Sequence, residues 1–81
     1  MFVILTKPDC KWCDQAKILL EKLGHEYTAL DITEHPSLLQ FMEASKLTTV
    51  PQVFCDGVII GGFDKLQLEF SFDEITPKDS D

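Results

Sequence analysis

Two cysteines separated by two residues, Cys10 and Cys13, are the side chains in this sequence best placed for chemistry. Thiols at this spacing can close to a disulfide and reopen, or they can supply thiolate ligands to a metal. The pair follows a short apolar run, Phe2 to Thr6, and stands where a helical pattern begins. The first N–H groups of a helix and its dipole stabilise a thiolate. This order favours dithiol redox chemistry, and we expect a lowered pKa at Cys10, the helix cap.

The two thiols have unequal positions on that helix. Cys13 lies one turn further in, with less access to solvent, so we expect Cys10 to attack a substrate disulfide and Cys13 to resolve the mixed disulfide. A metal site or an inert buried pair is the alternative. Structural zinc usually has four ligands, and the other donors, Cys55, His25 and His35, lack ligand spacing. We interpret Cys55 as a small buried hydrophobe and the histidines as solvated or capping.

The first half of the chain has the pattern of a strand, a helix and a second strand. Phe2 to Thr6 is continuously apolar, as in a strand buried on both faces in the middle of a sheet. Apolar residues recur at helical spacing from Lys11 to Leu23, and Gly24 supplies a stop. His25 to Ile32 predicts a second strand. Because such βαβ connections are nearly always right-handed, the two strands should be parallel neighbours.

The second half predicts a helix, a hairpin and a third helix. A capping residue and a proline precede apolar positions at helical spacing from about Pro36 to Lys46. Asp56-Gly57 is a strong turn signal between strands at Gln52 to Cys55 and Val58 to Ile60. A short helix is expected over Phe63 to Phe70. Four phenylalanines are expected in the core: Phe2, Phe41, Phe54 and Phe70.

Chain length and net charge exclude several classes of function. An 81-residue chain can form one modest core, which we assign to residues 1–72, followed by an acidic tail, 73–81, with a disordered end. The formal net charge of -7 argues against nucleic-acid binding, which needs a basic face. No apolar run approaches the roughly 20 residues that span a bilayer, and the apolar start lacks a basic signal segment. We expect a cytoplasmic protein without nucleic-acid or membrane partners.

Three segments together carry a resemblance to a known family: Lys7 to Cys13, Thr49 to Phe54, and Ile60 to Asp64. In this order and spacing, they resemble a dithiol glutaredoxin of the small bacterial or phage type, in the thioredoxin-like superfamily. The resemblance implies an α/β fold with a four-stranded mixed sheet, a βαβ unit followed by a β-hairpin, flanked by about three helices. It also implies a cis peptide bond before Pro51, which would turn the Val50 backbone toward the cysteines.

The resemblance further implies a groove for glutathione. It places Lys7 at the glycine carboxylate, Thr49 and Val50 at the cysteinyl backbone, and a turn at the γ-glutamyl end. The implied binding residues are Lys7, Trp12, Thr49, Val50, Pro51, Gly62, Phe63 and Asp64. Their charges suit a tripeptide with two carboxylates and one ammonium group. The chain departs from the common pattern in three places: Lys11-Trp12 between the cysteines, Leu38 early in the second helix, and Lys65 beside Asp64.

By resemblance, the expected activity is glutathione-dependent thiol–disulfide exchange. The protein would reduce protein disulfides and glutathione mixed disulfides as a monomer, with glutathione as reductant and no metal. Ribonucleotide reductase is the usual partner that the family suggests. Two alternatives stay open: an electron donor reduced by thioredoxin reductase, and a carrier that holds an iron–sulfur cluster through Cys10 and glutathione.

Overall fold

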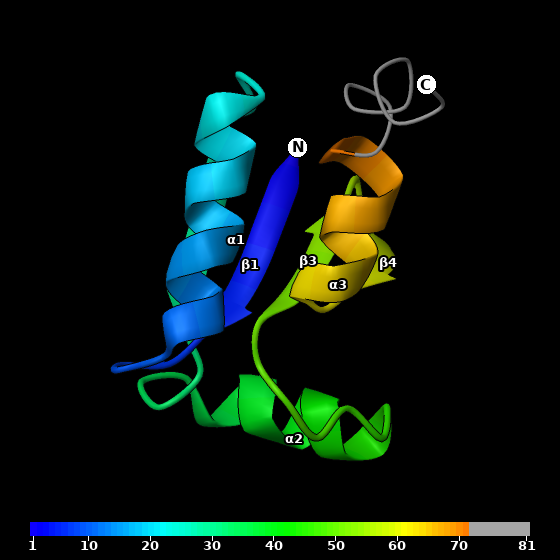
Figure 1. Ribbon diagram of the computed structural model, residues 1–81. Coiled ribbons are helices and arrows are strands. Elements are labelled where there is room, and N and C mark those ends of the chain that lie inside the picture. The colour runs from blue at the N-terminus through cyan, green and yellow to red at the C-terminus, as the bar shows by residue number, and fades with distance from the viewer. Residues whose placement is uncertain (72–81) are drawn as a thin grey trace.

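A computed structural model describes residues 1–71 as one sheet with helices on both faces (Figure 1). The predicted acidic tail and the domain boundary at residue 72 lie outside the described residues. The elements, in chain order, are β1 (Phe2–Thr6), α1 (Lys11–Lys22), β2 (Tyr27–Asp31), α2 (Pro36–Ala44), β3 (Gln52–Cys55), β4 (Val58–Gly61), α3 (Phe63–Leu66) and a π-helical segment, η1 (Gln67–Ser71).

The four strands form a mixed sheet in the order β2-β1-β3-β4. Strand β1 pairs with β2 in parallel, as the βαβ pattern predicted, and with β3 in antiparallel orientation. Strand β4 completes the hairpin with β3. The central position of β1 explains its continuous apolar sequence, because both of its faces are covered.

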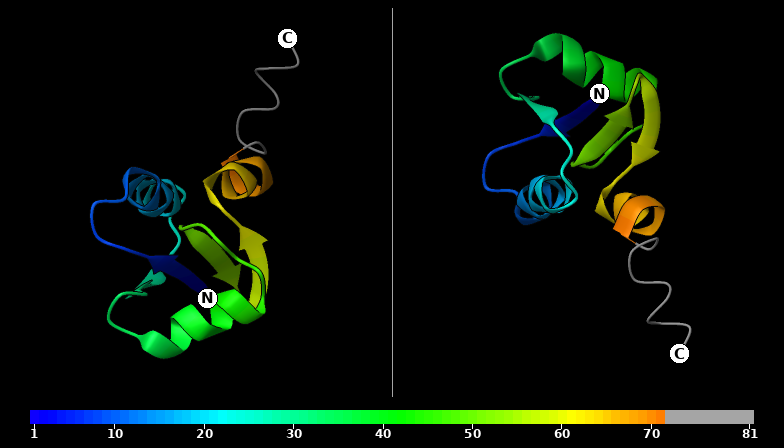
Figure 2. Two further views of the ribbon diagram at one scale, coloured as in Figure 1. Left: turned by 90° about the horizontal axis from the view of Figure 1, so that it is seen from below. Right: turned by 90° about the horizontal axis from the view of Figure 1, so that it is seen from above.

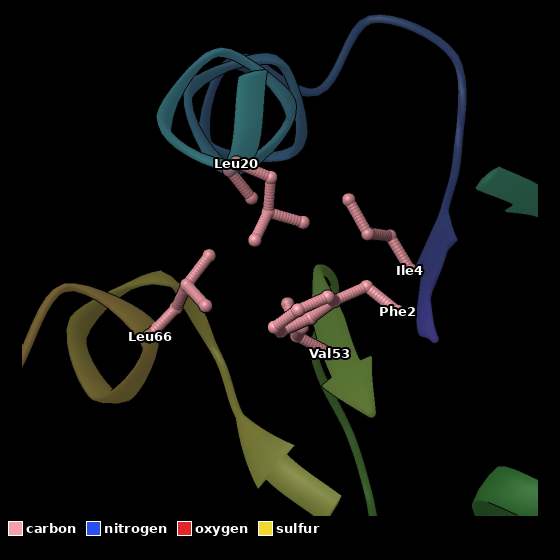
Figure 3. Packing of buried hydrophobic residues seen from close by; sticks show 6 residues of the cluster. Phe2, Ile4, Leu20, Val53 and Leu66 are labelled. Carbon is pink, nitrogen blue, oxygen red and sulfur yellow. The ribbon is translucent and has the colours of Figure 1, made fainter. Parts of the chain in front are cut away.

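Two apolar clusters hold the helices to the two faces of the sheet. Helices α1 and α3 lie on one face and α2 lies on the other (Figure 2). The first cluster consists of Phe2, Ile4, Ala16, Leu20, Val53 and Leu66. In Figure 3 its labelled side chains point toward one another from β1, α1, β3 and α3. The second cluster consists of Leu5, Ile32 and Met42, with partly buried apolar residues around them. Alternate residues of β1 therefore enter opposite cores.

Local backbone geometry matches the turn residues in the sequence. Gly24 follows α1 with a φ of 82°, in the left-handed region that favours glycine, and it ends the helix as predicted. Asp56 and Gly57 have φ values of 52° and 83° and join β3 to β4. Positive φ at both central residues is what a type I′ hairpin turn requires, so the Asp-Gly prediction is confirmed.

Three sequence expectations differ from the structure. Helix α2 ends at Ala44, before the expected Lys46, and its N-cap residue His35 makes no side-chain capping hydrogen bond. The third helix, expected over Phe63 to Phe70, is α-helical only to Leu66 and continues as the wider η1. A stretch this short holds too few apolar positions to distinguish the two helical periods. Phe41, expected in the core, is 43% exposed and contacts the ring of Phe54 from the surface of α2. Phe2 is buried and Phe54 packs against the second cluster. In the described part of the chain, no helix has the length and apolar character needed to cross a membrane.

Candidate active site

The cysteine pair lies at the start of α1, shortly after the end of β1. Cys10 is the N-cap residue of α1, and its sulfur is bonded to that of Cys13 in a disulfide. The backbone N–H of Cys13 donates a hydrogen bond to Cys10 Sγ at 3.1 Å. The predicted position of Cys10 at a helix cap is thus confirmed, and its sulfur accepts one of the N–H groups that a helix N-terminus leaves unpaired.

Burial distinguishes the two sulfur-bearing side chains. Cys13 is only 1% exposed and belongs to the interior, whereas Cys10 is half-buried. An incoming disulfide must reach the attacking sulfur along the S–S axis, and this requires access. Cys10 is therefore the more accessible cysteine of the pair, and Cys13 is enclosed by the protein interior.

A loop from the other half of the chain lies against this pair. The Val50-Pro51 peptide bond is cis, and the carbonyl oxygen of Val50 lies 3.9 Å from Cys10 Sγ. The buried side chain of Gln52 donates from Nε2 to the carbonyl oxygen of Thr49 at 3.0 Å. Gln52 therefore ties the loop to β3. Sequence reasoning assigned it no role, although an amide among the apolar residues of a strand was a signal.

A cavity of about 520 Å³ opens beside the cysteines and gathers most of the predicted binding residues. It is lined by Trp12, Thr49, Val50, Pro51, Gly62, Phe63, Asp64 and Lys65. One wall comes from the start of α1, one from the cis-proline loop, and one from the turn that begins α3. We call this the first cavity.

An aromatic pair forms part of the first cavity. The ring of Trp12 lies 5.3 Å from the ring of Phe63 between centroids, and Trp12 is 52% exposed. Lys11 Nζ lies 5.5 Å from the centroid of the Trp12 ring, within range of a cation–π contact. Trp12 thus supplies the apolar surface expected beside the sulfur, and Lys11 keeps a positive charge near it.

Lys7 is the one predicted binding residue that does not line the first cavity. It lines a second cavity, of about 340 Å³, whose other lining residues are Ile32, Leu39, Met42, Glu43, Leu47, Thr48, Thr49 and Val50. Thr49 and Val50 line both cavities. The two cavities are therefore neighbours on either side of the loop that contacts Cys10, and Lys7 belongs to the second.

The chain matches a known family in both sequence and fold. The glutaredoxin family model matches residues 2–60, more than half of the chain. The chain belongs to the glutaredoxin family. Glutaredoxin 3 of Escherichia coli strain K12 is 41% identical over 64 residues, which cover 78% of this chain and 77% of that protein. As a glutaredoxin, the chain is a thiol–disulfide oxidoreductase with Cys10 and Cys13 as its cysteine pair.

Another relative is a longer protein. The hybrid peroxiredoxin hyPrx5 of Haemophilus influenzae is 38% identical over 68 residues, covering 84% of this chain but only 28% of that protein. Two solved structures are similar in fold. A buckwheat glutaredoxin–glutathione complex has a TM-score of 0.77 at 25% identity, covering 94% of this chain and 73% of its own. The holo form of glutaredoxin C1 from Populus tremula x tremuloides has a TM-score of 0.77 at 31% identity, covering 94% and 72%. The thioredoxin-like fold is confirmed.

The third cysteine and the two histidines of this glutaredoxin lie outside both cavities. Cys55 is half-buried, packs against the first cluster and pairs with Phe2, at the end of β1 remote from Cys10. His25 and His35 are exposed. Within residues 1–71, no group of three or more His, Cys, Asp or Glu side chains is arranged to hold a metal ion.

The departures from the common family pattern have different surroundings. Leu38 is half-buried and packs against the second cluster, so its side chain belongs to the core between α2 and the sheet. Lys65 lines the first cavity next to Asp64. A Cβ placed on Gly61 would lie 3.0 Å from Lys65 Cγ, so the aliphatic part of this lysine runs over the Gly61 backbone. The charged end of the cavity therefore carries both a carboxylate and an ammonium group.

Proposed function

We propose that this glutaredoxin uses glutathione to reduce protein disulfides and glutathione mixed disulfides, with Cys10 as nucleophile and Cys13 as resolving thiol. One observation carries the proposal. The first cavity, open beside Cys10, has an apolar aromatic wall and Asp64 at one end, and it adjoins a second cavity that contains Lys7.

The lining of this site suits the chemistry of glutathione. The tripeptide carries an ammonium group and a carboxylate at its γ-glutamyl end and a second carboxylate at its glycine end. Asp64 can pair with the ammonium group and Lys7 with the glycine carboxylate. Between them, the exposed backbone of the Thr49 to Pro51 loop can pair with the cysteinyl residue as an extra strand would. A similar fold binds glutathione in the buckwheat complex, which supports the assignment.

The reaction needs only the two cysteines and the incoming thiols. The Cys10 thiolate attacks one sulfur of the substrate disulfide, so a Cys10–substrate bond forms and the other substrate sulfur leaves as a thiolate. The Cys13 thiol then loses its proton and attacks Cys10 Sγ, which releases the second substrate thiol and leaves the Cys10–Cys13 disulfide. Two glutathione molecules, oxidised together to glutathione disulfide, return the pair to the dithiol.

Turnover of a glutathione mixed disulfide, coupled to glutathione, glutathione reductase and NADPH, tests the assignment. Cys10→Ser should be inactive with every substrate. Cys13→Ser should keep activity toward the mixed disulfide, because glutathione can resolve the Cys10 adduct, and should lose activity toward protein disulfides. Equal losses in both variants for the mixed disulfide would contradict the assigned roles.

The same preparations separate the alternatives. Turnover with thioredoxin reductase but not with glutathione would make the protein an electron donor that thioredoxin reductase reduces. Visible absorbance in anaerobically purified protein, together with a dimer on sizing, would indicate an iron–sulfur carrier. Ribonucleotide reductase as a partner, the monomeric state and the cytoplasmic location stay predictions.

A further inference from the structure

The second cavity is more apolar than glutathione requires. Its lining includes Ile32 and Met42, which are 8% and 5% exposed and belong to the second cluster, so its floor is continuous with the protein core. Leu47 and Val50 are partly buried around the same cluster. Leu39 also lines the cavity and is 43% exposed at its edge. Lys7 and Glu43 are the only charged residues among those that line this cavity.

Glutathione leaves this apolar lining without a partner. In the orientation of the proposed function, on which this inference rests, the glycine carboxylate lies at Lys7. Glycine has no side chain, so the tripeptide brings nothing apolar to Leu39, Met42 or Leu47. A protein substrate does not stop there, since its chain continues past the reactive cysteine and can place a side chain in the cavity.

We propose that the second cavity is a specificity site for an apolar side chain one or two residues after the reactive cysteine of a protein substrate. Three features support this occupant. The cavity adjoins the first one through Thr49 and Val50, whose backbone can pair with a bound peptide. Its volume of about 340 Å³ accommodates one large aliphatic side chain. Its exposed leucine gains from being covered, which glutathione cannot do.

The exchange step allows a direct measurement on such peptides. In Cys13→Ser, the Cys10 thiolate attacks the peptide sulfur of a mixed disulfide between a cysteine peptide and 2-nitro-5-thiobenzoate. The S–S bond breaks, the peptide stays on Cys10, and the coloured aromatic thiolate leaves because its thiol has the lower pKa. The rate of colour release needs no glutathione. Amidated peptides with leucine or asparagine at the tested positions differ in polarity and little in size.

We expect the leucine peptide to react about fivefold faster at subsaturating concentration, which corresponds to about 1 kcal/mol of partial burial. Leu39→Gln should bring the ratio of the two rates close to one. Ile18→Gln, at a leucine-sized residue of similar exposure (46%) on α1 that lines neither cavity, should leave the ratio unchanged. The double variant Cys10→Ser/Cys13→Ser keeps only Cys55, so its rate of colour release gives the background reaction of that thiol.

Two results would overturn the inference: equal rates for the two peptides in Cys13→Ser, or a leucine preference that persists in Leu39→Gln. Turnover with glutathione is measured separately, by the coupled assay. A protein that turns over glutathione mixed disulfides but shows no leucine preference refutes the specificity site alone. A protein with no glutathione turnover refutes the proposed function.

Discussion

Leu66 anchors the helix that carries one wall of the first cavity. Its side chain is fully buried in the cluster with Ile4, Leu20 and Val53 (Figure 3). The three residues before it line the first cavity. Leu66→Ala removes three buried carbons at about 0.8 kcal/mol each and leaves a void, which gives a loss of about 3 kcal/mol. A chain of this length has a total stability of about 4 to 12 kcal/mol, so this loss is a large part of it.

Urea unfolding of the disulfide form, followed by far-ultraviolet circular dichroism, measures this loss. With a slope of about 1.5 kcal/mol/M, the midpoint should fall by about 2 M. Leu68 provides a matched control, because it is a leucine two residues further on and is 61% exposed. Leu68→Ala should change stability by less than about 0.5 kcal/mol. A loss below about 1 kcal/mol for Leu66→Ala, or equal losses in both variants, would refute the claim that the first cluster anchors α3.

Three further predictions concern single positions. Gly61→Ala should lower the free energy of unfolding in urea by about 1 to 3 kcal/mol, because φ at Gly61 is 124° and the new Cβ would lie 3.0 Å from Lys65 Cγ. An unchanged unfolding midpoint would contradict this prediction. The hydroxyl and N–H of Thr33 donate to the Asp31 carboxylate and lower its pKa, so stability from this group is lost as the pH falls through that lowered value. Thr33→Ala should raise the pKa of Asp31 in an NMR titration. Alkylation of the reduced protein by iodoacetamide should show a pKa for Cys10 below the ordinary value of about 8.5, and a midpoint at or above it would refute thiolate stabilisation by the helix.

The strands and helices around the cysteines could be predicted because each has a local cause. The run Phe2 to Thr6 is apolar at every position that meets a core, and the strand has the predicted bounds. Helix α1 begins at the predicted Lys11 and ends one residue before the predicted Leu23, because Gly24 takes the left-handed conformation just beyond it. A short stretch of sequence is enough to predict where an element ends when one residue type, such as glycine, sets the backbone geometry there.

The shape of the site could not be predicted in the same way, because it depends on contacts between distant segments. The residues that the family resemblance indicated for glutathione all line the first cavity except Lys7. The structure places Lys7 in a second cavity whose floor comes from Ile32 and Met42. Neither residue carries a chemical signal in the sequence. Phe41 shows the same limit, because helical spacing does not say whether a position at the edge of the apolar face is covered.

The two cavities depend on different halves of the core. Leu66 in the first cluster fixes α3 and with it the wall that holds Asp64, whereas Met42 in the second cluster forms the floor beneath Lys7. Strands β1, β2 and β3 each contribute side chains to both clusters, and β3 begins where the loop of Val50 contacts Cys10. A change in one cluster should therefore alter one half of the groove, while the reactive sulfur keeps its place between them. Substitutions in either cluster could therefore change the ligand preference of the neighbouring cavity while the position of the disulfide stays the same.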